Sequence, residues 1–117
     1  NSERFDTDGI HNTVTNNARL TCQTAGKYII AGTLAFAANA TVSIRAIAVY
    51  LNGTTFLATH FTTPLSVAAS TNLSIATIYE LAVNDYVTLQ AYQDSGGNLN
   101  VNASANYSPE FAMLRIV

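Results

Sequence analysis

Apolar and polar residues alternate with a period of two along much of the chain, which is the pattern of half-buried β-strands. The clearest segment is residues 27–37, whose large side chains occupy alternate positions: Tyr28, Ile30, Leu34 and Phe36. No stripe with a period of 3.6 residues runs through the alanine-rich residues 31–40, so no helix is expected there. We predict a strand over residues 27–37 with one large apolar face.

A hairpin is predicted around Asn52 and Gly53. Residues 42–51 are rich in β-branched side chains, and a strand pattern resumes over residues 54–61. Asn-Gly between two such runs favours a type I′ turn, because both central residues of that turn need a positive φ.

Further strands are predicted in the second half of the chain, over residues 73–81, 86–93, 99–103 and 111–117. The segments between them are a loop over residues 62–72, a turn at Val83-Asn84-Asp85, a glycine-rich turn over residues 94–98 and a loop over residues 105–109. Seven or eight short strands without a helix predict one all-β domain over residues 1–117, an antiparallel sandwich or barrel.

Charge is unusually scarce in this sequence. The chain has 117 residues, of which 49% are apolar and 10% charged, and its net charge is -2. An average soluble protein is about 25% charged. Five scattered cations cannot form the basic stripe that neutralises phosphates, and no apolar run approaches the roughly 20 residues of a membrane span. We therefore expect neither nucleic-acid binding nor membrane insertion.

Two sets of residues invite a catalytic interpretation. His60, Asp85 and Ser95 follow the chain order of a chymotrypsin-like triad, but that site lies between two barrels and this chain has residues for about one. Asp94 and Glu110 could be a glycosidase pair, although all-β glycosidases are normally larger and carry an aromatic cleft. We expect no catalytic residues and no enzymatic activity.

The spacing of the Asp, His and Cys residues gives only weak evidence for a metal site. Asp6 and Asp8 offer carboxylates, but an EF-hand needs a glycine at its sixth position, where His11 stands. His11 and His60 lack companions at zinc-site spacing, and Cys22, the single cysteine, has no disulfide partner in the chain. We expect no metal, no cofactor and a buried free thiol at Cys22.

Five motifs resemble, in order, those of the globular head of complement component 1q and of the tumour-necrosis-factor-like jelly roll, especially its bacterial and bacteriophage members. They are FDTDGI at residues 5–10, AGKY at 25–28, LNGT at 51–54, LAVNDYV at 81–87 and FAML at 111–114. Asn84 stands where the family has glycine, a conservative exchange because asparagine also tolerates a positive φ. The family has a further strand before the first motif, so we expect the C-terminal head of a longer protein or a domain whose opening strand is missing.

The resemblance implies a jelly-roll sandwich of about ten strands that assembles as a tight homotrimer. The residues add support, because residues 42–51 are apolar on both faces. Either a second subunit or loops of the same domain would cover the second face. The candidate residues for the trimer interface are Tyr28, Phe36, Tyr92 and Phe111.

The function that we expect from the resemblance is a non-enzymatic module on the surface of a bacteriophage virion, in a tail fibre, a spike or a capsid decoration. Its partners would be two further copies, other virion proteins, and a host-surface glycan or receptor. Candidate recognition loops are residues 12–17, 62–71 and 95–98, and the tyrosines that could stack on sugars are Tyr50, Tyr79, Tyr92 and Tyr107. The alternatives are a secreted receptor- or carbohydrate-binding module of complement or cytokine type and, third, a small hydrolase that uses Ser95.

Overall fold

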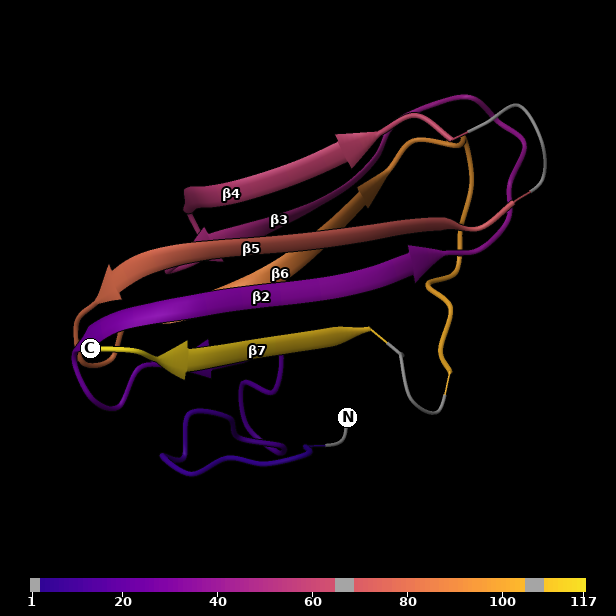
Figure 1. Ribbon diagram of the computed structural model, residues 1–117. Coiled ribbons are helices and arrows are strands. Elements are labelled where there is room, and N and C mark those ends of the chain that lie inside the picture. Colours follow the sequence, from indigo (N-terminus) through magenta and orange to yellow (C-terminus); the bar gives the residue numbers. More distant parts are fainter. Residues whose placement is uncertain (1–2, 65–68, 105–108) are drawn as a thin grey trace.

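In the part of the chain that the structure describes, seven strands form two antiparallel sheets (Figure 1). The computed structural model describes residues 3–64, 69–104 and 109–117, and none of them is helical. The strands are β1 (Arg19–Thr21), β2 (Gly26–Phe36), β3 (Arg45–Leu51), β4 (Thr55–Thr62), β5 (Thr71–Leu81), β6 (Tyr86–Gln93) and β7 (Glu110–Arg115). One sheet has the order β1-β6-β3-β4 and the other β5-β2-β7. The predicted all-β antiparallel sandwich is confirmed in this coarse form.

Strand β2 is the centre of the three-stranded sheet. It pairs with β5 along its whole length and with β7 from Tyr28 to Thr33. Its even-numbered side chains point at the other sheet and are buried, as the alternation predicted, and its odd-numbered ones point outward. The core between the sheets therefore receives Tyr28, Ile30, Leu34 and Phe36 from this strand.

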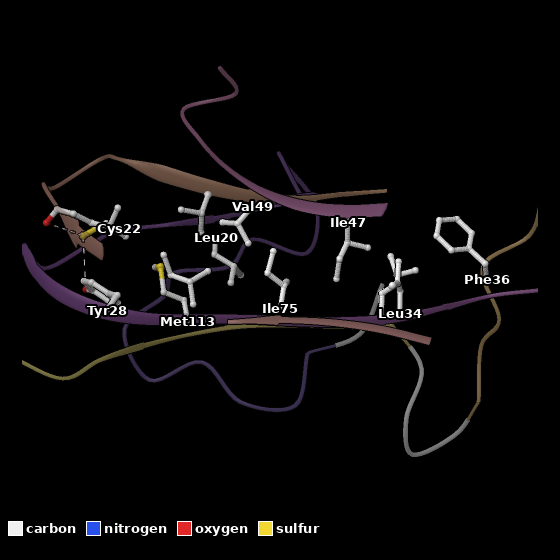
Figure 2. Packing of buried hydrophobic residues seen from close by; sticks show 13 residues of the cluster. Leu20, Cys22, Tyr28, Leu34, Phe36, Ile47, Val49, Ile75 and Met113 are labelled. Carbon is white, nitrogen blue, oxygen red and sulfur yellow. Dashed lines mark hydrogen bonds between the residues drawn. The ribbon is translucent and has the colours of Figure 1, made fainter. Parts of the chain in front are cut away.

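The four-stranded sheet supplies the opposite half of the core (Figure 2). Ile47 and Val49 of β3, Val87 of β6 and Leu20 of β1 are all buried against the three-stranded sheet. Gly32 lies close to the opposite sheet, because a Cβ at this position would stand 2.7 Å from the side chain of Leu89. Glycine at the middle of a strand thus permits close packing of the layers.

Two turns confirm the expectation of positive φ. Asn52 and Gly53 have φ angles of 50° and 78°, which is the type I′ hairpin, and Asn84 has a φ of 73°. The Asn52 side chain also joins these turns: its Nδ2 donates to Asp85 Oδ1 at 2.9 Å, and its Oδ1 accepts from the Tyr86 N–H at 3.0 Å. Hydrogen bonds from Asn52 and from the Ala82 N–H outweigh desolvation and lower the pKa of Asp85.

Cys22 is buried and unbridged, as predicted. Its thiol contacts Thr24 O at 3.3 Å and Tyr28 Oη at 3.7 Å. The Tyr28 hydroxyl donates to Thr24 O at 2.6 Å. Burial and the neighbouring Cys22 raise the pKa of Tyr28 to about 12.

Arg45 corrects the predicted start of the third strand. The strand expected from residue 42 begins at Arg45, whose side chain is 1% exposed. Its guanidinium donates to Ser43 Oγ at 2.6 Å and to the carbonyl oxygens of Thr41 and Ile44 at 3.2 Å. These bonds tie the guanidinium to residues 41–44, which precede the strand, while the Ile44 carbonyl also accepts from the Asp94 N–H at 3.4 Å.

One predicted strand was wrong, and one observed strand was missed. Residues 99–103 form no strand but a single bridge between Val101 and Phe36, extended by hydrogen bonds from the Ala37 N–H to Asn100 O and from the Asn102 N–H to Ala35 O. Strand β1 was not predicted at all, since three residues carry too little pattern and owe their conformation to pairing with β6. Residues 65–68 and 105–108 of the predicted loops lie outside the described residues.

Candidate functional site

The four residues predicted for a trimer interface do not share a surface. Tyr28 and Phe36 are in the core of the single chain, where no neighbouring subunit can reach them. Phe111 pairs with Gly32 and is half-buried against the same core. Tyr92 is exposed, but on the outer side of the other sheet. The physical reason is the strand period, which turns the large side chains of β2 inward.

Apolar side chains do gather on the outer side of the three-stranded sheet. Ile29 of β2 stands directly between Ile78 of β5 and Leu114 of β7, and all three are exposed. Two residues further along β2, the next row on the same side of the sheet consists of Ala112, Ala31 and Ala76. We call these six residues the aliphatic face. It is a flat apolar surface of the kind that proteins use for association.

The sequence carried a signal for the aliphatic face that alternation alone does not reveal. In a strand with one solvent-exposed face, the positions of Ile29 and Ile78 would carry polar residues. Apolar residues at these outward-facing positions indicate that the outer side of the sheet is also covered, by another part of the protein or by a partner. The prediction assigned this property to residues 42–51, where the structure divides it: Ala48 is buried in the single chain between its cross-strand neighbours Thr59 and Gln90, whereas Val42 and Ile44 are exposed.

The outer side of the four-stranded sheet is aromatic instead. Tyr50 packs on Phe56 with ring centroids 4.3 Å apart, and Phe61 and Tyr92 flank Ala46 from the two adjacent strands. Phe56, Phe61 and Tyr92 are exposed. Tyr50, Phe56, Phe61, Tyr92 and Tyr86 form what we call the aromatic face. Of the tyrosines proposed for sugar stacking, it contains Tyr50 and Tyr92; Tyr79 lies exposed on β5, and Tyr107 is outside the described residues.

The structure does not bring the triad candidates together. Asp85 and Ser95 lie beyond opposite ends of β6, an eight-residue strand that spans more than about 20 Å. The His60 Nδ1 is 2.8 Å from Ser74 O, a link between the sheets, and the Ser95 Oγ is 2.6 Å from Gln93 Oε1. Each residue therefore serves a different local contact.

The paired-carboxylate candidates are engaged separately as well. Asp94 Oδ1 accepts from the Ile44 N–H at 2.6 Å, which joins the loop before β3 to the end of β6. Glu110 forms an ion pair with Arg4 at 2.6 Å. Neither contact resembles an acid paired with a nucleophile across a cleft.

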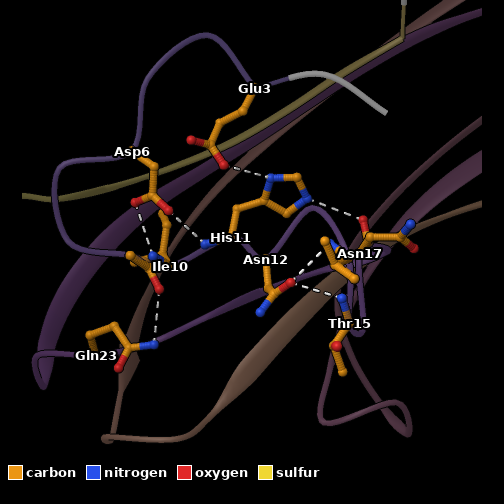
Figure 3. A network of polar contacts seen from close by, with 10 residues as sticks. Glu3, Asp6, Ile10, His11, Asn12, Thr15, Asn17 and Gln23 are labelled. Atoms are coloured by element: carbon orange, nitrogen blue, oxygen red, sulfur yellow. Dashed lines mark hydrogen bonds and ion pairs between the residues drawn. The ribbon is translucent and has the colours of Figure 1, made fainter.

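The FDTDG motif builds the N-terminal loop through the Asp6 carboxylate (Figure 3). Asp6 accepts the N–H groups of Ile10 and His11, each at 2.9 Å, one on each carboxylate oxygen. Burial works to raise the pKa of Asp6, but the backbone hydrogen bonds outweigh it and lower the pKa. In the part of the chain that the structure describes, no three His, Cys, Asp or Glu side chains converge as metal ligands.

The N-terminal loop also borders a polar cleft on the outer side of β1. Its volume is about 220 Å³, and Arg19 and Thr21 of β1 form its floor together with residues of the loop. This cleft includes part of the predicted recognition loop 12–17. Among the other predicted loops, residues 95–98 form a turn in which Gln93 Nε2 donates to Gly97 O at 2.8 Å.

The sequence matches no protein-family model, and no curated protein matches it either. Over the described residues the structure contains no helix long and apolar enough to cross a membrane.

Proposed function

We propose that the chain is a non-enzymatic jelly-roll head that assembles as a homotrimer on the surface of a bacteriophage virion. The strand order supports the jelly roll: five of the six connections cross between the sheets, and only β3–β4 is a hairpin within one sheet. A double-sheet jelly roll has about eight strands, and the resemblance implies about ten. A further strand added at the outer edge of β7 would bring the seven described strands to eight.

The aliphatic face is the observation that carries the assembly. Ile29, Ile78 and Leu114 are side by side in register, and burying such side chains contributes roughly 25 cal/mol per Å². The face is bordered at one end by Lys27 and Glu80, paired across β2 and β5. Opposite charges at one rim are self-complementary, so a second copy of the chain fits this surface better than a partner of a single charge.

The rest of the surface supports a role in recognition on a particle. A head held by its aliphatic face still exposes the aromatic face and the N-terminal cleft, which belong to the other sheet. Low charge with many Thr, Asn and Ser side chains suits hydrogen bonding to host-surface glycans or proteins. The resemblance to bacteriophage members of the family supplies the virion context.

Light scattering of the purified chain tests the assembly. We expect a mass three times the 12.5 kDa of one chain at micromolar concentration. Ile78→Lys should reduce the mass to that of a monomer, because a lysine cannot be buried unpaired at the interface. Phe56→Lys is the matched control: Phe56 is 62% exposed and Ile78 is 60% exposed, but Phe56 lies on the aromatic face, and its variant should stay trimeric.

A monomeric wild-type chain, or loss of the trimer in Phe56→Lys alone, would contradict the assembly. The virion role has its own test, which is labelling of purified phage particles by an antibody against this chain. Labelled particles are expected, and particles that contain no copy of the chain would overturn the virion role while leaving the trimer intact.

A further inference from the structure

The polar cleft beside β1 has a cation without a counter-ion at its floor. Arg19 lies over Tyr86, with the guanidinium carbon 4.4 Å from the ring centroid. Its Nε is buried and has no hydrogen-bond partner, and the ion pairs found among the described residues do not include Arg19. Buried donors in native proteins almost always have a partner, so an unsatisfied one calls for an explanation.

The walls of the cleft are held in place by hydrogen bonds of their own (Figure 3). Asn12 Oδ1 accepts the N–H groups of Val14 and Thr15 at 2.9 and 2.8 Å, which leaves the Asn12 Nδ2 hydrogens for a ligand. Gln23 Nε2 donates to Gly9 O at 3.1 Å, which leaves Oε1 as an acceptor. The cleft thus combines a planar cation with two amide groups that are already held in place, and Thr15 and Thr21 add hydroxyl groups to its lining.

The aromatic face continues from the cleft across the sheet. Arg19 pairs with Thr88 of β6, Thr88 pairs with Tyr50 of β3, and Tyr50 pairs with Phe56 of β4. Residues paired in this way share one face, so the rings of Tyr50 and Phe56 lie on the same side as Arg19. Two strand spacings, about 10 Å, separate Arg19 from Tyr50. An extended ligand can therefore occupy the cleft and reach the rings.

We propose that the Arg19 cleft binds the carboxylate of an acidic sugar residue, of the uronic acid class, within a surface polysaccharide. The arginine fork matches a carboxylate, and the amide and hydroxyl side chains suit sugar hydroxyls. A drug-sized ligand occupies a pocket of roughly 300–1,000 Å³, so 220 Å³ suits a single ring. One cation favours one carboxylate rather than a phosphate-rich polymer. This inference rests on the proposed function, whose ligand class it names.

Titration calorimetry with an oligomer of galacturonic acid tests the inference, and the same oligomer with its carboxylates methyl-esterified is the matched control ligand. We expect binding to the acid and at least tenfold weaker binding to the ester. Arg19→Gln removes the charge but keeps most of the stem over Tyr86, and it should weaken binding of the acid at least tenfold. Arg4→Gln is the control variant, because Arg4 pairs with Glu110 outside the cleft, and it should bind normally.

Equal binding of acid and ester would overturn the role of the carboxylate, and normal binding by Arg19→Gln would overturn the site. Binding of a poly-glutamate peptide but not of the sugar would overturn the ligand class. Asn12→Ala provides a second variant if Arg19→Gln is unfolded by circular dichroism, and it should weaken binding of the acid. Light scattering of each variant separates the two proposals, since a trimer that does not bind contradicts only the cleft, and a monomer that binds contradicts only the assembly.

Discussion

The two sheets of this molecule are alike inside and different outside. Their inner faces meet in one apolar core, but the outer side of the three-stranded sheet presents Ile29, Ile78 and Leu114, whereas that of the four-stranded sheet presents aromatic rings. Aliphatic side chains in a flat row gain free energy only by losing water, which favours a permanent partner. Rings beside amides and hydroxyls can hold a polar ligand and release it. In the function that we propose, one domain separates assembly from recognition.

The largest expected effect is a difference in the free energy of unfolding between substitutions on the inward and the outward side of β2. Ile30→Ala should lower the free energy of unfolding by about 2–5 kcal/mol, because Ile30 is fully buried in the core. Ile29→Ala, one position away, should change it by less than about 1 kcal/mol, because Ile29 faces outward. Urea unfolding of both variants in the Ile78→Lys background measures the difference without a contribution from assembly. Similar losses for the two would show that the outer side of β2 is packed within the single chain.

The second effect concerns the three-stranded sheet at alkaline pH. The pKa of Tyr28 is raised from 10.0 to about 12, so the folded protein binds the phenol proton more tightly than the unfolded chain does. The protonated phenol therefore contributes to the stability of the fold in full below pH 10, and this contribution is lost as the pH rises toward 12. Tyr28→Phe loses the hydrogen bond to Thr24 O, which costs about 0.5–1.5 kcal/mol at neutral pH. Thermal melting from pH 8 to 11 should show a smaller alkaline loss in the variant. An unchanged alkaline slope would exclude Tyr28 as its source.

The smallest effect concerns the four-stranded sheet at acid pH. Hydrogen bonds from Asn52 and Ala82 lower the pKa of Asp85 from its ordinary value of 3.8, so its contribution to stability is present above about pH 4 and is lost as the pH falls through the folded pKa. Asp85→Asn should cost less than about 1 kcal/mol at pH 7, because solvent screens the carboxylate. The variant should lose less stability between pH 5 and 3 than the wild type. If both lose the same amount, Asp85 does not carry the acid response, and Asp6, whose pKa is also lowered, is the next residue to test.

Much of the fold was predictable from local pattern. The eleven residues of β2 alternate so regularly that both their strand and their buried side follow from the sequence. Asn52 with Gly53, and Asn84, have backbone conformations that few other residues tolerate, so their turns were predictable too. The short β1 and the bridge at Val101 were not, because pairing with β6 and β2 decides them rather than local preference.

The candidate site was far less predictable than the fold. The prediction selected large aromatic residues for the interface, and two of them, Tyr28 and Phe36, are core residues. Size and apolarity do not distinguish an interface from a core, because the same hydrophobic effect buries both. The stacking of Arg19 on Tyr86 could not be predicted from the sequence either, because the two residues are far apart in the chain and meet through the pairing of β1 with β6.

The sequence by itself determined the longer strands, the tight turns, the buried thiol and the side of β2 that faces inward, because each depends on the conformational preferences and periodicity of adjacent residues. Only the tertiary structure decided which residues share a surface. Ile29, Ile78 and Leu114 form one row because the register of three strands aligns them, and Arg45 is buried because loop oxygens surround it. Register and burial depend on the whole chain, and a surface that can bind is a consequence of both.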